Sequence, residues 1–242
     1  MSIITSRAVI RPLVEAAIAD YHSQGIDAFV KTIHETILSK KIKFPVLEYA
    51  AKELYQAIPG QDEIAVTDRI IDLQALGGNV IAGYMLQLRL GDHFDESFRK
   101  AVAYIIRGNE WYVCDIIGER VMGHGLLTYP DVAIPELMQF AIHENKRIVR
   151  AIGVATHYAV KKGLKKRYAR DMFGLLLQLA GTTDFHTKKG IGWAAKTIAK
   201  FHPDIIEQYS EHIEGGEVRQ WFKTKIKIGL GRTGKYAHRY TG

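Results

Sequence analysis

The stretch that decides the fold reads NKRIVRAI at residues 145–152, and it overlays without gaps on KKGIGWAA at residues 188–195. One repeat earlier, CDIIG at residues 114–118 overlays on VRAIG at residues 149–153. The offsets of 35 and 43 residues bracket the period of about 40 residues that is typical of helical solenoid repeats. The overlay therefore predicts that a helical unit recurs along the chain.

Apolar residues recur at helical spacing through most of the sequence, and the alternation of period two that marks strands is nearly absent. Short breaks containing Gly or Pro separate these helical segments. We therefore predict an all-α fold, a curved α–α superhelix of helical hairpins. Residues 1–222 would form a single repeat domain, and residues 223–242 a basic tail. The alternative is a bundle of unrelated amphipathic helices.

The composition sets outer limits on function. The chain has 242 residues, with 33 Lys and Arg against 26 Asp and Glu, a formal charge of +7. This excess favours a polyanionic partner, either nucleic acid or an anionic membrane surface. A single cysteine, Cys114, excludes an intrachain disulfide and indicates a reducing compartment. No apolar run has the length of a signal or a membrane span, so we expect a soluble cytoplasmic protein. Since repeat proteins are often monomeric, we expect a monomer.

Three chemically distinct side chains share one position of the repeat, namely Asp115, Arg150 and Trp193. Trp111 precedes Asp115 by four residues and shares its helical face. Inner helices of a stacked array line one continuous concave surface, which suits an extended ligand such as a duplex. Taken singly, each residue is more typical of a core or a solvated surface.

Four cations lie near the predicted starts of two inner helices. Because backbone N–H groups and cationic side chains can hold phosphates together there, we predict DNA contacts for these four. They are Lys146, Arg147, Lys188 and Lys189. A solvated basic face is the ordinary alternative.

Three segments resemble the AlkD-type DNA alkylation repair glycosylases, which are built from HEAT-like repeats. The segments are EWYVCD at 110–115, Asn145 followed after five residues by Arg150, and KGIGW at 189–193 followed by FHPD at 201–204. The resemblance implies functional roles for Trp111, Asp115, Arg150 and Trp193. It also implies that the lesion stays near the duplex while the protein contacts sugar and backbone.

The sequence departs from the family pattern at two positions. Glu110 stands where the family often has a first Trp, and Tyr112 stands where an Asp is usual. The lesion preference could therefore differ from that of other members.

The chemistry follows from the residues themselves. A purine alkylated at N3 or N7 carries a positive charge, so it departs from deoxyribose without the general acid that ordinary glycosides need. Asp115 alone would stabilise the developing sugar cation and orient water. Trp111 and Trp193 would flank the sugar, and Arg150 would grip a phosphate.

We therefore predict a DNA glycosylase that acts on alkylated purines in double-stranded DNA without a cofactor. No metal site is expected, since the histidines show no ligand spacing. Two alternatives stay open: a non-catalytic protein that binds DNA of unusual backbone shape, and a protein-interaction scaffold.

One further motif, GLGRTG at residues 229–234, satisfies the GxGxxG pattern of nucleotide-binding loops. Such a loop needs a following helix whose N-terminus faces the phosphate, and only six residues follow Tyr236. We therefore assign the motif to the basic tail.

Overall fold

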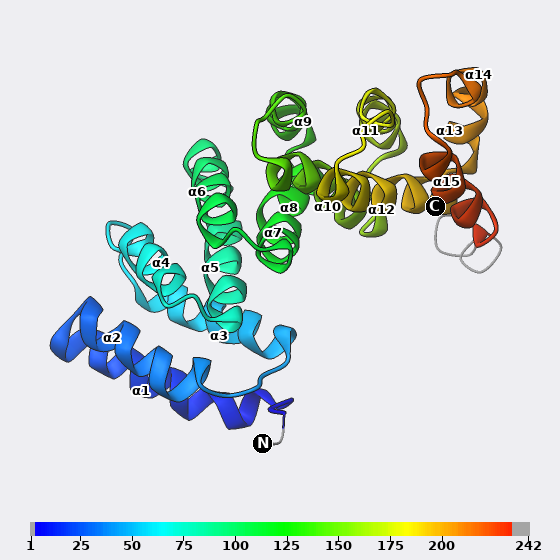
Figure 1. Cartoon of the computed structure of the whole chain (residues 1–242). Coiled ribbons are helices and arrows are strands. Elements are labelled where there is room, and N and C mark those ends of the chain that lie inside the picture. Colours follow the sequence, from blue (N-terminus) through cyan, green and yellow to red (C-terminus); the bar gives the residue numbers. More distant parts are fainter. Residues whose placement is uncertain (1–2, 234–242) are drawn as a thin grey trace. The chain divides into compact units, whose positions relative to one another are not determined.

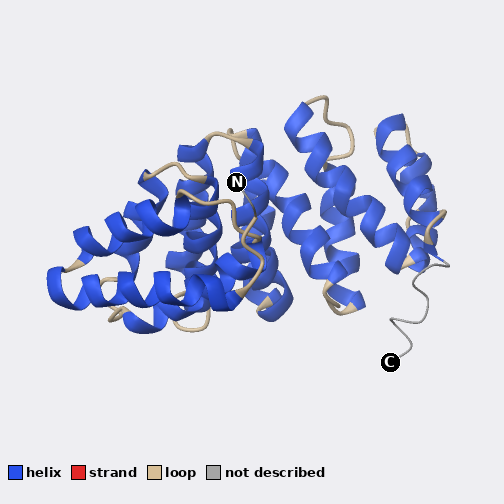
Figure 2. Cartoon of the chain, turned by 90° about the horizontal axis from the view of Figure 1, so that it is seen from below, coloured by secondary structure: helices blue, strands red, loops and turns tan. Residues whose placement is uncertain are grey.

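The computed structural model describes residues 3–233, and in this range every regular element is a helix (Figure 2). The nearest approach to a strand is an isolated parallel bridge between Ile4 and Ile42. The predicted all-α helical-repeat fold is thereby confirmed. No helix in this range combines the length and the apolarity needed to cross a membrane.

The chain divides into two compact units, at residues 1–104 and 105–242. The first unit consists of helical pairs in which α1 packs on α2 and α3, and α5 packs on α3 and α4 (Figure 1). Its helices are α1 (Arg7–Gln24), α2 (Ile26–Thr32), the π-helix η1 (Ile33–Leu38), α3 (Phe44–Ala57), α4 (Glu63–Asp72) and α5 (Leu76–Arg89). Helix α6 (Phe94–Gly108) contains the division.

The second unit contains an inner row and an outer row of helices (Figure 1). The inner row is α7 (Trp111–Ile117) continued by the π-helix η2 (Gly118–Gly123) and α8 (His124–Thr128), then α10 (Lys146–Lys161), α12 (Phe185–Phe201) and α15 (Gln220–Leu230). The outer row is α9 (Pro130–Phe140), α11 (Lys166–Gln178), α13 (Pro203–Gln208) and α14 (Ser210–Glu214). This alternation is the hairpin repeat that the overlay predicts.

Glycines bring neighbouring inner helices close together. A methyl group on Gly153 of α10 would overlap the backbone of Gly190 of α12, and one on Gly229 of α15 would overlap the carbonyl of Lys196 of α12. Without side chains at these positions the backbones can approach closely, as at small-residue helix contacts elsewhere. In each pair of neighbouring inner helices, residues near the start of one helix contact residues near the start of the other, and later residues contact later residues. The inner helices therefore run parallel to one another.

Helix α15 falls partly within the segment expected as a basic tail. Residues 220–230 are helical, and Phe222, Ile226 and Gly229 are buried, because α15 packs its apolar side against α12. Within the GxGxxG pattern, Gly229 and Leu230 thus belong to a helix instead of a phosphate-binding loop. Residues 234–242 of the expected tail lie outside the described residues.

Candidate functional site

The turn between α6 and α7 sets the position of Trp111. Asn109 adopts a left-handed conformation with φ of 48°, which Asn tolerates better than most residues because its short side chain can bond locally. A methyl group on Gly108 would press against Val113. Helix α7 begins at Trp111 directly after this turn, and Trp111 is 55% exposed.

Asp115 and Arg150 form a bidentate ion pair across α7 and α10. Arg150 Nε donates to Asp115 Oδ1 and Nη2 donates to Oδ2, both at 2.8 Å. The Arg150 side chain is 9% exposed and the Asp115 side chain is 19% exposed. Burial acts to lower the pKa of Arg150, but the hydrogen bonds and charge of Asp115 raise it above its ordinary value. The two hydrogen bonds hold the carboxylate in one geometry, and its partial exposure leaves it reachable from solvent.

Trp193 lies on the next inner helix, α12, where it stacks on His157 of α10. Their ring centroids are 3.8 Å apart and their planes are inclined by 22°. On α10, Arg150 and His157 are seven residues apart, which is two helical turns on one face or about 10 Å. Trp193 is therefore closer to the C-terminal part of α10 than its overlay on Arg150 suggests.

The structure thus joins two of the four predicted side chains directly. Asp115 and Arg150 are in contact, and Trp111 lies one turn before Asp115 on the same helix. Among the described residues, neither Trp111 nor Trp193 makes a hydrogen bond or ring contact with that ion pair. Trp111 instead meets the edge of Tyr112 at 5.9 Å between centroids.

Cys114, next to Asp115, faces the interior. Its Sγ donates to the carbonyl of Arg147 at 3.1 Å. Burial, followed by the charge of Asp115, raises the pKa of this thiol to about 12. Cys114 therefore stays protonated and helps to join α7 to α10, and it does not serve as a nucleophile.

The helix starts that carry the predicted phosphate-binding cations are well capped. The Asn145 side chain accepts from Arg147 N at 2.9 Å, and the Asp184 side chain accepts from Thr187 N at 2.7 Å. Burial acts to raise the pKa of Asp184, but the hydrogen bonds from Thr187 outweigh it and the pKa is lowered. These caps fix where α10 and α12 begin.

The four cations themselves differ in their surroundings. Lys146 is exposed, whereas Arg147 is half-buried. Lys188 Nζ lies 5.9 Å from the centre of the Trp221 ring, and Lys189 Nζ lies 5.2 Å from that of Phe185. Both lysines therefore already contact aromatic rings.

A second group of cations, which the sequence analysis missed, lies within electrostatic range of His157 or of Lys196. We call it the C-terminal cation cluster; its members are Lys161, Lys196, Lys200, Lys225 and Arg232. Burial first, and then the charges of three other cluster members, lower the pKa of Lys196. Helical spacing could have identified part of the cluster, because Trp193, Lys196 and Lys200 follow one another at i, i+3 and i+7.

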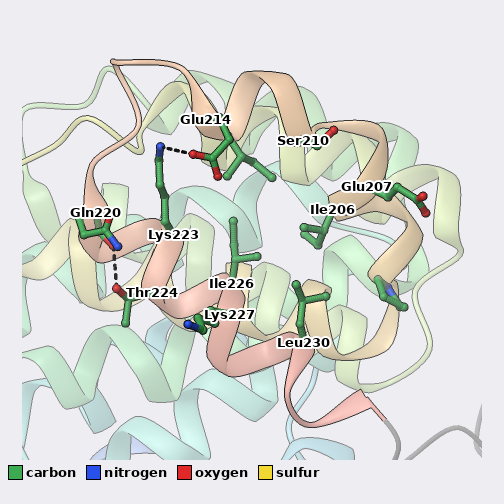
Figure 3. A pocket seen from close by; sticks show the side chains of 12 residues that line it. Ile206, Glu207, Ser210, Glu214, Gln220, Lys223, Thr224, Ile226, Lys227 and Leu230 are labelled. Atoms are coloured by element: carbon green, nitrogen blue, oxygen red, sulfur yellow. Dashed lines mark hydrogen bonds and ion pairs between the residues drawn. The ribbon is translucent and has the colours of Figure 1, made fainter.

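A groove of about 620 Å³ opens between α13, α14 and α15 (Figure 3). Its floor is apolar, with Ile206, Ile226 and Leu230, and Lys223 pairs with Glu214 at its rim. None of the predicted site residues lines this groove or the smaller one of about 460 Å³ in the first unit. The Asp115–Arg150 pair therefore belongs to neither groove.

Comparison with known proteins assigns the family. No curated protein and no solved structure matches the chain. A family model described as DNA alkylation repair enzyme matches residues 16–222, which include most of both units. The chain therefore belongs to the DNA alkylation repair enzyme family.

Proposed function

We propose that the protein is a DNA glycosylase that hydrolyses the N-glycosidic bond of purines alkylated at N3 or N7 in duplex DNA. The observation that carries this proposal is a single carboxylate, Asp115, fixed by a buried guanidinium and left partly exposed beside Trp111. The family assignment supports repair of alkylated DNA as the setting.

The reaction needs one carboxylate because the leaving group is already cationic. The C1′–N bond breaks, the base departs neutral with the bonding electrons, and the sugar becomes oxocarbenium-like. Water then adds to C1′ and releases one proton to the solvent. Asp115 stabilises the positive sugar and orients that water.

Arg150 takes a positioning role in this proposal. Each carboxylate oxygen has two lone pairs, and Arg150 occupies one on each oxygen. The remaining lone pairs can accept from water, so the ion pair orients Asp115 without blocking it. The two bonds to Asp115 use two of the five guanidinium N–H groups, so the phosphate contact expected for Arg150 does not require the ion pair to break. We assign further phosphate binding to the C-terminal cation cluster.

The charge of the second unit supports duplex binding. Residues 105–242 contain 22 Lys and Arg against 13 Asp and Glu, a formal charge of +9. Among the described residues, no carboxylate forms an ion pair with Lys196 or Lys225. Cations without protein partners are suited to phosphates, which dominate the affinity of proteins for duplex DNA.

The test is release of free base from duplexes that contain 7-methylguanine or 3-methyladenine. We expect Asp115→Asn to lower the single-turnover rate by about 100-fold or more, because the carboxylate charge acts mainly in the transition state. Trp193→Ala should lower it less. Asp171→Asn makes the same charge change on an exposed position of α11 and should leave the rate unchanged.

Equal release by wild type, Asp115→Asn and Trp193→Ala would refute the assignment. Salt-sensitive binding without release would identify a protein that only recognises DNA shape. Absence of DNA binding at moderate salt would favour the interaction scaffold.

A further inference from the structure

His157 covers one face of the Trp193 indole. The two rings are nearly parallel, with centroids 3.8 Å apart, and His157 is only 9% exposed whereas Trp193 keeps partial exposure. The imidazole comes from α10 and the indole from α12, so the stack joins two inner helices. A ring packed in this way restricts the rotation of the indole.

Hydrogen bonds fix the imidazole in turn. Thr197 Oγ1 donates to the carbonyl of Trp193 at 3.0 Å and lies 2.7 Å from His157 Nδ1. Since the hydroxyl has one proton and gives it to Trp193, it accepts from His157. Nδ1 therefore carries the proton of a neutral imidazole.

The surroundings keep His157 neutral. Burial, with the charges of Lys161, Lys196 and Lys200, lowers its pKa to about 3. A neutral imidazole adds no positive charge beside the indole. The opposite face of Trp193 then retains its attraction for a cation.

We propose that His157, held by Thr197, is a positioning residue that sets the plane of the Trp193 indole for contact with the deoxyribose of the damaged nucleotide. This inference rests on the proposed glycosylase function. It assigns to His157 no contact with the reacting atoms, and neither the overlay nor the family resemblance indicated this residue.

Two substitutions separate the stack from the hydrogen bond. His157→Phe keeps a ring against Trp193 but loses the bond to Thr197. His157→Asn keeps a donor near the position of Nδ1 but loses the ring. The pair therefore tests which of the two interactions orients Trp193.

Fluorine NMR of protein labelled with 5-fluorotryptophan gives a readout independent of catalysis. The chain has three tryptophans, Trp111, Trp193 and Trp221, and a Trp→Phe variant assigns each resonance. We expect His157→Asn to shift the Trp193 resonance and to leave the other two in place.

The rate of base release should distinguish the same two variants. We expect His157→Asn to lower the single-turnover rate about tenfold, because a misplaced contact group forfeits part of the orientation effect. His157→Phe should stay within about threefold of wild type. Affinity for undamaged duplex should change by less than about twofold in both variants, as neither removes a cation.

Wild-type rates in His157→Asn, or a Trp193 resonance that does not move, would overturn the proposal. A shift of all three resonances would also contradict it, since a general structural change is not selective positioning. If the wild type itself releases no base, the glycosylase assignment fails. The positioning role of His157 can then still be tested by adding undamaged duplex to the labelled protein. If His157 orients Trp193, the duplex should shift the Trp193 resonance in wild type and His157→Phe but not in His157→Asn.

Discussion

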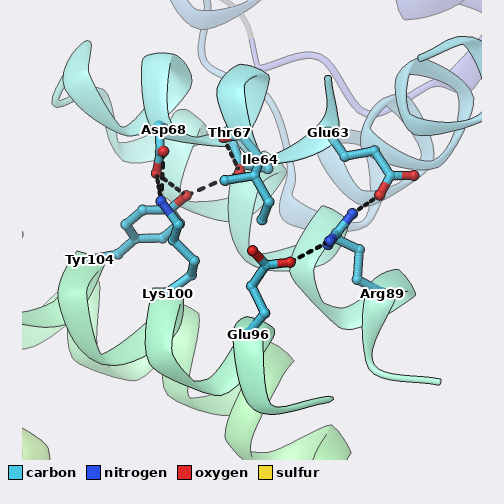
Figure 4. Close-up of polar contacts among 8 residues, drawn as sticks. All are labelled: Glu63, Ile64, Thr67, Asp68, Arg89, Glu96, Lys100 and Tyr104. Carbon is cyan, nitrogen blue, oxygen red and sulfur yellow. Dashed lines mark hydrogen bonds and ion pairs between the residues drawn. The ribbon is translucent and has the colours of Figure 1, made fainter. Parts of the chain in front are cut away.

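The two units use charge in different ways. Residues 1–104 contain 11 Lys and Arg against 13 Asp and Glu, a formal charge of −2, whereas residues 105–242 carry +9. In the first unit Arg89 is bound by both Glu63 and Glu96, and Lys100 is bound by Asp68 at 2.7 Å (Figure 4). Charge in the first unit is neutralised within the protein, whereas the second unit has an excess suited to an external anion.

Helix packing differs in a corresponding way. In the first unit the ion pairs of Figure 4 connect α4, α5 and α6, and a methyl group on Gly78 would come no nearer than 3.1 Å to its neighbours. In the second unit glycines let α10, α12 and α15 approach closely. Among the described residues of the second unit, Lys196 and Lys225 form no ion pair with a carboxylate, so these two cations are suited to an external anion.

Breaking the ion pairs of the first unit should have the largest effect on stability. Arg89→Ala leaves the buried carboxylate of Glu63 without its partner. We expect the free energy of unfolding to fall by about 3–5 kcal/mol, the usual result of removing one member of a buried pair. Urea denaturation followed by circular dichroism measures this change.

The matched control is Arg69→Ala, which removes an exposed ion pair with Asp27. These two side chains are 52% and 79% exposed, so the loss should be no more than about 1 kcal/mol. Similar losses in the two variants would show that burial does not distinguish these pairs.

Filling a helix contact in the second unit should have the next largest effect. A methyl group at Gly190 would overlap the carbonyl of Arg150. Gly→Ala in a helix gains up to about 1 kcal/mol in propensity, but overpacking at this contact should give a net loss of about 1–3 kcal/mol. Displacement of Arg150 should also slow base release. Thermal unfolding and single-turnover assays test the two effects.

Gly216→Ala is the control within the same unit, because no atom lies within 4 Å of the added methyl group. Gly78→Ala tests the comparison between units: its methyl group would lie 3.1 Å from the carbonyl oxygen of Ile70, a tight contact but a smaller overlap than at Gly190, so we expect a smaller loss. A smaller loss for Gly190→Ala than for Gly78→Ala would contradict the difference in packing that we describe.

The sequence predicted the fold well because helical periodicity is a local property. The breaks at Gly and Pro separated the hairpins. The overlay of residues 114–118 on 149–153 gave Asp115 and Arg150 the same position in successive repeats, and in the structure the two side chains are in contact. The helical structure of residues 223–230 was missed, since a short basic helix resembles a tail until its apolar side meets α12.

The site was less predictable because it depends on helix register. The overlay set Arg150 equivalent to Trp193, yet Arg150 packs over Gly190 and Trp193 packs against His157. The close approach of α10 and α12 at Gly153 and Gly190 determines this register, and an overlay of similar residues does not reveal it. Repeat position thus identified the correct helices but not every neighbouring side chain.

Acid should lower the free energy of unfolding through His157 of the second unit. The pKa of His157 is lowered to about 3, from an ordinary value of 6.5, chiefly by burial. Between these values the unfolded chain binds a proton that the folded chain does not, so stability is lost as the pH falls below about 6.5. The slope for this group approaches about 1.4 kcal/mol per pH unit.

His157→Phe should remove this contribution, and urea denaturation at pH 7, 6, 5 and 4 measures it. Burial lowers the pKa of His124 and His202 as well, so some acid sensitivity should persist in the variant. Parallel pH profiles for wild type and His157→Phe would show that His157 titrates alike in the folded and unfolded chain.

Single cations should have the smallest effects, and they test the charge comparison directly. Each lysine that neutralises a phosphate contributes about 0.9 to the slope of log K against log salt. Lys225→Ala should therefore reduce the slope for duplex binding by about one, and Lys196→Ala should do the same. Lys31→Ala removes an exposed cation of the first unit and should leave the slope unchanged. Because all three changes remove one positive charge, equal slopes would mean that net charge alone attracts the duplex and that the C-terminal cation cluster makes no specific phosphate contact.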